Sequence, residues 1–156
     1  MMKFKALSPI LVGLGLGVLI SKTLVCKVTV DGVSMLPTYY SGDTLLVEKL
    51  SKVDRGDIIT FHNNGKAFIK RVVAVPGDTV KIVDSSLIVN GEKVDEPYVT
   101  TTMYSGGMIE DRELLLSDRE YFVLGDNRSS SIDSRNFGVI HEDDILGVRL
   151  IDLKRS

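Results

Sequence analysis

Short apolar runs separated by turn-forming residues follow one another from residue 24 onward. Runs of this kind, bounded by Gly, Pro, Asn and Asp, are typical of β-strands. No long amphipathic helix pattern follows residue 26, so we expect a mainly β domain. The segment Pro97–Leu116 lacks the pattern and predicts a long surface loop or a small extension. The strands are expected over the following ranges: Leu24–Val30, Thr44–Glu48, Ile58–Phe61, Ala67–Val75, Thr79–Val83, Ser86–Val89, Glu92–Val94, Tyr121–Leu124 and Ile145–Leu153.

The N-terminal segment has a different pattern. After Lys3 and Lys5, the run Ala6–Ile20 is almost wholly apolar. As a helix it covers about 22 Å, and an extension to Cys26 brings it to about 31 Å, close to the ~30 Å of a bilayer core. The segment 6–26 therefore predicts one transmembrane anchor. The positive-inside rule then places residues 1–5 in the cytoplasm and residues 27–156 on the extracytoplasmic face.

Three other interpretations of this segment compete with the transmembrane anchor. A cleavable secretory signal would need a small-x-small cleavage site, and none follows the apolar run. A lipoprotein signal ending at Cys26 is disfavoured because Leu24 and Val25 are bulky. A buried core helix is disfavoured by the basic N-terminus and the glycines in the run.

The composition of the chain argues against several kinds of binding site. The chain has 156 residues and a net charge of −2, which fits one domain with a short appendage and does not favour nucleic-acid binding. Its single cysteine excludes an internal disulfide, and only two histidines are present, which argues against a zinc site. No glycine-rich phosphate loop occurs. We therefore expect no cofactor and no metal.

Ser34 is the first candidate for chemistry. It follows a predicted strand and lies between Gly32 and Pro37, where the chain must turn. A serine hydroxyl is a weak nucleophile unless a base takes its proton.

Lys70 is the candidate for that base. It lies in the middle of the apolar strand Ala67–Val75. Such a lysine either points to solvent or is desolvated with a depressed pKa, and in the second case it can act as a base. Alternation places Lys70 on the same face as Phe68 and Val72, which favours burial.

The segment Gly125–Gly138 combines serines with alternating charges, at Asp126, Arg128, Asp133 and Arg135. Charges at this density can form internal ion pairs that make a loop rigid. A solvated, turn-rich loop fits the same pattern, and the residues alone do not separate the two interpretations.

Taken together, these stretches resemble the type I signal peptidases, membrane-bound serine proteases that remove signal peptides. The order of the motifs behind one N-terminal anchor is most similar to the Gram-positive form. The resemblance spans about Met1 to Leu153. The matching motifs are Ser34-Met35-x-Pro37-Thr38, Arg55-Gly56-Asp57-Ile58, Lys70-Arg71-Val72 with Pro76-Gly77-Asp78, and Gly125-Asp126-Asn127-Arg128 with Ser131-x-Asp133-Ser134-Arg135-x-Phe137-Gly138.

The resemblance implies a fold of two antiparallel sheets and a Ser–Lys dyad without histidine. Ser34 would be the nucleophile and Lys70 the general base, with Ser131 orienting Lys70 through a hydrogen bond. Asp133 and Arg135 would form a supporting ion pair, and Asp126 and Arg128 would belong to the same scaffold.

The oxyanion site departs from the family pattern at one position. The Ser34 backbone N–H is one donor, but Gly32 stands where some members of the family have a serine. A backbone group or water would have to replace that side chain.

The implied partners are signal peptides of exported preproteins and the lipid of the cytoplasmic membrane. An extended peptide ending in Ala-x-Ala would pair with the strand edges Val28–Asp31 and Ala67–Ile69. Ordinary core packing remains the alternative for each pocket residue. The expected pocket residues are Val28, Val30, Met35, Phe68 and Ile69.

Two other functions stay open at this stage. One is a different Ser–Lys protease of related fold, such as the self-cleaving SOS repressors, although no DNA-binding module is recognisable. The other is a membrane-anchored binding protein without activity. The presence of both Ser34 and Lys70 disfavours the second.

Overall fold

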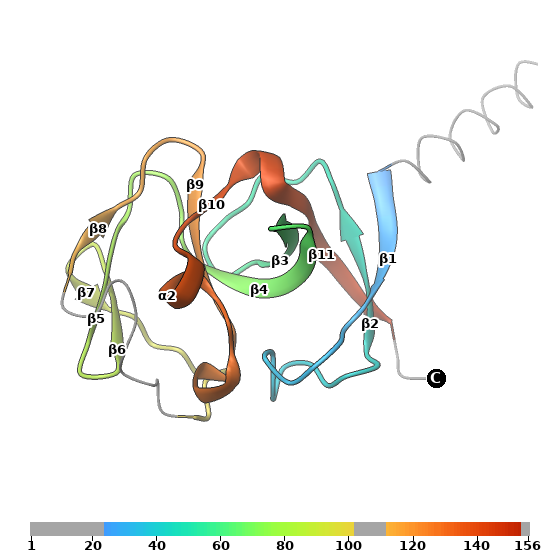
Figure 1. Cartoon of the computed structure of the whole chain (residues 1–156), viewed down its shortest axis with the longest axis horizontal. Helices are drawn as coiled ribbons and strands as arrows, with labels where there is room; N and C mark the ends of the chain where they lie inside the picture. The colour runs from blue at the N-terminus through green and yellow to red at the C-terminus, as the bar shows by residue number, and fades with distance from the viewer. Residues whose placement is uncertain (1–23, 102–111, 154–156) are drawn as a thin grey trace, which may run out of the picture.

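The computed structural model describes residues 24–101 and 112–153, which form two antiparallel β-sheets. The larger sheet has the strand order β1-β2-β11-β3-β4-β9-β10, and the smaller one has the order β7-β6-β5-β8. Figure 1 shows the two sheets side by side, with β9 of the larger sheet nearer the smaller sheet and α2 next to β9. The strands are β1 Val25–Thr29, β2 Thr44–Glu48, β3 Ile58–Asn63, β4 Lys66–Ala74, β5 Thr79–Val83, β6 Ser86–Val89, β7 Glu92–Lys93, β8 Leu114–Leu115, β9 Glu120–Leu124, β10 Ile140–His141 and β11 Ile145–Leu153.

The expected strands are confirmed, and so is the mainly β fold with two antiparallel sheets. Within the described residues the sequence pattern missed the two-residue strands β8 and β10. It also missed the short helix α2, Ser134–Phe137, and the 3₁₀ turns η1, Arg128–Ser130, and η2, Glu142–Asp144. Elements this short carry too little hydrophobic periodicity to be recognised from sequence.

Most of the expected membrane anchor, up to residue 23, lies outside the described residues. Its last two residues, Val25 and Cys26, lie in β1, where they pair with Glu48 and Val47 of β2. Among residues 24–101 and 112–153, no helix is long and apolar enough to cross a membrane.

Side-chain alternation explains how the sheets form their cores. In β2, β5 and β6 every second residue is buried, as expected of strands with one covered face. The smaller sheet packs its buried side chains against Phe122 and Leu124 of β9 and Val73 and Ala74 of β4. Strand β4 is thus covered on both faces, which explains its nearly continuous apolar sequence.

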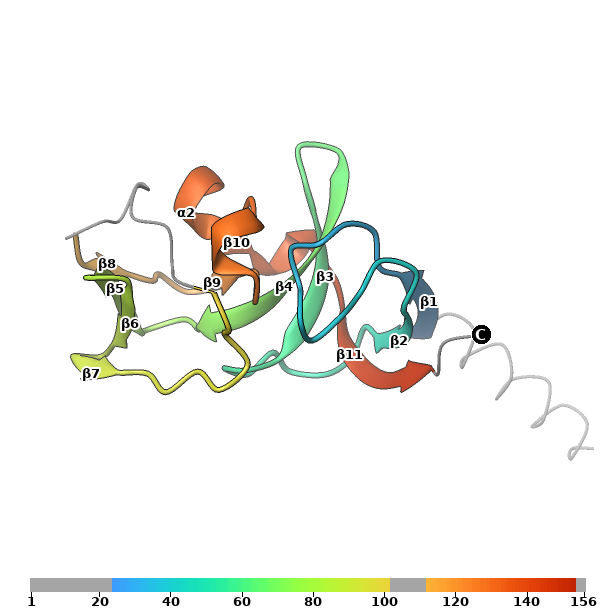
Figure 2. The ribbon, with the colours of Figure 1, turned by 90° about the horizontal axis from the view of Figure 1, so that it is seen from below.

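One edge of β4 is only partly paired. Strand β3 pairs with β4 from Lys66 to Arg71, but β9 pairs with it only from Arg71 to Ala74. The first half of β4 therefore has an open edge. Strand β1 is the terminal strand of the same sheet, so it also has a free edge. Figure 2 shows the turn between β3 and β4 projecting from the rest of the molecule.

Gly147 is the position where β11 passes closest to β2. A Cβ atom on Gly147 would lie 2.7 Å from the Glu48 carbonyl oxygen and 3.3 Å from the Val47 Cβ. We predict that Gly147→Ala lowers the free energy of unfolding by about 1–3 kcal/mol, because the two strands must move apart. Urea unfolding measures the change. Leu150→Ala, at an exposed position of the same strand, should change stability by less than about 0.5 kcal/mol. Equal unfolding midpoints for wild type and Gly147→Ala would show that the strands are not in close contact.

Candidate active site

Ser34 lies in the turn that follows β1. The backbone of Gly32 has a φ of +92°, in the left-handed region that favours glycine, and this conformation turns the chain toward Ser34. The Ser34 carbonyl oxygen accepts a hydrogen bond from the Asn127 backbone N–H at 3.0 Å. The turn that carries Ser34 is thus fixed to the segment after β9.

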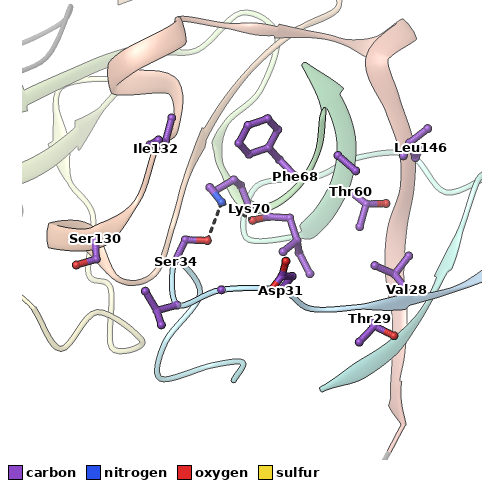
Figure 3. A pocket seen from close by; sticks show the side chains of 14 residues that line it. Val28, Thr29, Asp31, Ser34, Thr60, Phe68, Lys70, Ser130, Ile132 and Leu146 are labelled. Atoms are coloured by element: carbon purple, nitrogen blue, oxygen red, sulfur yellow. Dashed lines mark hydrogen bonds between the residues drawn. The ribbon is translucent and has the colours of Figure 1, made fainter. Parts of the chain in front are cut away.

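Lys70 points from β4 to Ser34. Its Nζ lies 2.8 Å from Ser34 Oγ and 2.8 Å from the carbonyl oxygen of Ile69 (Figure 3). The side chain is buried, with 3% of the residue exposed. The alternation of β4 correctly indicated this burial. The distance allows a hydrogen bond in which a neutral amine would accept the Ser34 proton.

Burial lowers the pKa of Lys70 from its ordinary value of 10.5 to about 8, because the charged ammonium loses its hydration. The carboxylates of Asp133 and Asp126 oppose this effect through their negative charge. The Phe68 ring, whose centroid is 5.5 Å from Nζ, forms part of the apolar surroundings. A substantial fraction of Lys70 is therefore neutral near physiological pH.

Ser34 and Lys70 open onto a cavity of about 500 Å³. Figure 3 shows Val28 and Thr29 on one side of this cavity and Ser130 and Ile132 at its other end, beyond Ser34. The full lining is Val28, Thr29, Asp31, Gly32, Val33, Ser34, Thr60, Ala67, Phe68, Ile69, Lys70, Ser130, Ile132 and Leu146.

The expected pocket residues fall into two groups. Val28, Phe68 and Ile69 line the cavity. Val30 and Met35 do not line this cavity. They are 3% and 1% exposed and belong to a core cluster packed beneath the Ser34 turn. The structure therefore favours core packing for these two residues, which was the alternative to a place in the substrate pocket.

Ser131 does not make the expected hydrogen bond to Lys70. Its Oγ is buried and has no hydrogen-bond partner in the part of the chain that the structure describes. It does lie at the site: a Cβ on Gly125 would come within 2.2 Å of Ser131 Oγ and 2.5 Å of the Ser34 carbonyl oxygen. Gly125 therefore gives Ser131 and the Ser34 turn the space to lie against β9.

The four charged residues of the segment after β9 are all buried and all paired. Arg135 Nη2 lies 2.8 Å from Asp133 Oδ2, so this pair forms as expected. The Asp133 carboxylate also accepts hydrogen bonds from the backbone N–H groups of Gly125 and Arg135, and it caps α2. One internal ion pair, Asp133–Arg135, and two pairs to residues outside the segment thus hold it in place, so it is not a solvated loop.

A family model described as signal peptidase, peptidase S26, matches residues 3–152. The chain belongs to the signal peptidase I family. It is a serine-type signal peptidase, and the family cleaves signal peptides from preproteins.

Individual relatives agree with this assignment. Signal peptidase I U of Bacillus subtilis (strain 168) is 40% identical over 130 residues, covering 76% of this chain and 70% of the relative. Signal peptidase IB of Staphylococcus aureus (strain Mu50) is 36% identical over 148 residues, covering 83% and 78%. A crystal structure of a signal peptidase I from Enterococcus faecalis V583 superposes with a TM-score of 0.52 at 33% identity, covering 63% of this chain and 97% of that chain.

Two ion-pair partners in this signal peptidase were not foreseen from the sequence. Asp126 pairs with Arg71, at 2.9 and 2.7 Å, and also accepts a hydrogen bond from Thr38. Arg128 pairs with Glu96 through two hydrogen bonds, at 2.8 and 2.6 Å. Arg71 adjoins Lys70 in sequence and could have been proposed. Glu96 lies 32 residues from Arg128, and no local signal connects them.

The segment around Glu96 is held against the site by a second contact. The guanidinium carbon of Arg71 lies 3.9 Å from the centre of the Tyr98 ring, and the Tyr98 hydroxyl donates to Glu96 at 2.8 Å.

In the described residues, no group of three or more His, Cys, Asp or Glu side chains is placed to hold a metal ion.

The Glu96–Arg128 pair provides a stability test. The Arg128 side chain is fully buried, so Glu96→Gln leaves its charge without a counterion. We predict that this variant loses about 3–5 kcal/mol of unfolding free energy, measured in urea. The matched control is Glu113→Gln, at an exposed position, which should change stability by less than about 0.5 kcal/mol. A loss below about 1 kcal/mol in Glu96→Gln would contradict the importance of this pair.

Proposed function

We propose that this protein is a membrane-bound serine endopeptidase that removes signal peptides from exported preproteins after Ala-x-Ala sequences. Ser34 is the nucleophile and Lys70 is the general base. The observation that carries this proposal is the 2.8 Å contact between Ser34 Oγ and the amine of a buried lysine, at one wall of a cavity.

In the first step the neutral amine of Lys70 takes the proton of Ser34 as Oγ attacks the scissile carbonyl carbon. The electron pair of the C=O bond moves to the oxygen, and a tetrahedral intermediate forms. When the intermediate collapses, Lys70 gives its proton to the leaving amine and the peptide bond breaks. A water molecule, deprotonated by Lys70, then hydrolyses the ester on Ser34.

The oxyanion of the intermediate requires hydrogen-bond donors. The Ser34 backbone N–H makes no hydrogen bond to any described residue, so it is available for this role. Gly32 lies beside it without a side-chain donor. In this proposal, Gly32 contributes its backbone conformation to the oxyanion site, and Ser34 contributes the N–H.

The substrate binds as an added strand. The free edge of β1 and the open first half of β4 face the same cavity, and an extended peptide between them can hydrogen-bond to either edge. Alternate side chains of that peptide point to the wall formed by Val28, Phe68 and Ile69. The proposal places the small side chains of alanine, at the first and third positions before the cut, against this wall.

The membrane location of the enzyme is also a proposal. It rests on the apolar segment 6–26 behind Lys3 and Lys5, with β1 taking the last residues of that range. The cytoplasmic residues would be 1–5, and the catalytic domain, 27–156, would lie on the extracytoplasmic face, in contact with membrane lipid.

Removal of either dyad member should abolish cleavage. We predict that Ser34→Ala and Lys70→Met each lower the kcat for a peptide spanning an Ala-x-Ala site by roughly 10⁶-fold, as when another serine protease loses its nucleophile or its base. Mass spectrometry of the products measures the rate and the cut position. Lys93→Met is the matched control, because it removes an exposed lysine from β7 in the smaller sheet and should retain wild-type activity.

The possible outcomes distinguish the proposed function from the two other functions that the sequence allows. Retained cleavage in Lys70→Met would rule out the dyad. If wild type binds the peptide but never cuts it, the anchored binding protein is the better interpretation. Cutting confined to the protein's own chain would favour a self-cleaving protease.

The pH dependence follows from the state of Lys70. The active form is neutral, and its pKa is about 8. The cavity contains one other titratable side chain, Asp31, and the facing carboxylates Asp126 and Asp133 are ion-paired. We predict that kcat/KM rises about tenfold per pH unit below about pH 7, rises less steeply near pH 8 and then levels off. A profile that is flat between pH 6 and 8 would contradict a lysine base.

A further inference from the structure

The peptide unit between Val33 and Ser34 is held by a side chain outside the dyad. This unit carries the Ser34 N–H at one end and the Val33 carbonyl oxygen at the other. The Val33 oxygen accepts two hydrogen bonds, from Asn127 Nδ2 at 3.2 Å and from the Leu36 backbone N–H at 3.2 Å. The Leu36 bond lies within the Ser34 turn, whereas Asn127 connects that turn to the segment after β9. The backbone N–H of Asn127 binds the next carbonyl, that of Ser34, at 3.0 Å. One residue therefore holds both carbonyl groups that flank the nucleophile.

The orientation of the Asn127 amide is itself fixed. Its Oδ1 accepts a hydrogen bond from the Ser129 hydroxyl at 3.1 Å. Thr101 Oγ1 accepts the Arg128 N–H at 3.0 Å, which leaves its own proton free to donate to Asn127 Oδ1 at 3.5 Å. With Oδ1 on two hydroxyl donors, Nδ2 is directed to Val33. Asn127 is 9% exposed, so little water competes for these bonds.

This arrangement matters because the peptide unit is planar and its two ends move together. A hydrogen bond at the Val33 oxygen fixes the direction of the Ser34 N–H, and it also polarises that N–H, which makes it a stronger donor. The Ser34 N–H has no partner among the described residues, and Gly32 offers no side chain beside it. The orientation of a single N–H then determines much of the oxyanion stabilisation.

We propose that Asn127 is a positioning residue for the oxyanion site, acting through the Val33–Ser34 peptide unit. This inference rests on the proposed role of Ser34 as nucleophile. Asn127 touches neither the substrate nor the reacting atoms. It aligns the backbone donor before the transition state forms, so its loss affects the transition state more than substrate binding.

The test compares Asn127→Ala with wild type in full-length protein. The variant keeps the backbone bond to Ser34 and introduces no charge near Lys70. We expect kcat to fall about tenfold with KM unchanged, less than the roughly 100- to 1,000-fold effect of deleting an oxyanion donor. The pH midpoint of the reaction should not move. Asn64→Ala, in an exposed turn, is the matched control and should behave as wild type.

A transition-state probe separates positioning from a purely structural role. A peptide aldehyde ending in Ala-x-Ala forms a bond between Ser34 Oγ and the aldehyde carbon. The carbonyl electron pair moves to the oxygen and the serine proton passes to Lys70. The resulting adduct places an oxyanion at the site. Its inhibition constant should rise about tenfold in Asn127→Ala, in proportion to the fall in kcat. The corresponding peptide alcohol, which forms no adduct, should bind equally to both proteins.

The outcomes distinguish this inference from the proposed function. If Ser34→Ala abolishes cleavage but Asn127→Ala retains full kcat and aldehyde affinity, only the role of Asn127 is refuted. Equal losses of aldehyde and alcohol binding would also refute it, since they indicate a distorted cavity. If Asn127→Ala does not fold, Asn127→Leu replaces it, because this uncharged change of similar size also removes the Nδ2 donor. Cleavage retained in Ser34→Ala would instead refute the proposed function.

Discussion

The burial of the Lys70 amine is the constraint on which the rest of the site depends. The fall of its pKa from 10.5 to about 8 corresponds to a cost on the order of 3 kcal/mol for keeping the ammonium in the folded protein at neutral pH. Because the folded-state pKa is lowered, the cost is fully present below pH 8. It decreases as the pH rises from 8 to 10.5. The fold must offset this cost elsewhere, and two hydrophobic clusters against β4 contribute to that.

The ion pairs around the site stabilise it without returning Lys70 to its charged form. A free carboxylate near the amine would raise its pKa strongly. Asp126 and Asp133, the two carboxylates that act on Lys70, are each bound to an arginine, Arg71 and Arg135. Their charges are largely neutralised within the pairs. Asp133 can therefore hold the backbone N–H groups of Gly125 and Arg135 in place, while desolvation remains the dominant effect on Lys70.

The sequence predicted much of this structure where the signal is local. Strand boundaries follow from short apolar runs, and the burial of Lys70 follows from its neighbours Phe68 and Val72. The Glu96–Arg128 pair and the Asn127–Val33 bond join segments far apart in the chain, so no spacing rule reveals them. Val30 and Met35 show a related limit: both are apolar and near Ser34, but their depth in the core depends on how β1 packs on β2.

The most direct test of the account is the pKa of Lys70, measured by NMR on the full-length chain in detergent micelles with labelled lysine side chains. Comparison with Lys70→Met assigns the resonance. The account predicts that one lysine titrates near pH 8 and that this signal is missing in the variant. A Lys70 resonance that titrates above pH 10 would show that almost none of the amine is neutral at pH 7, and the proposed base would then be wrong.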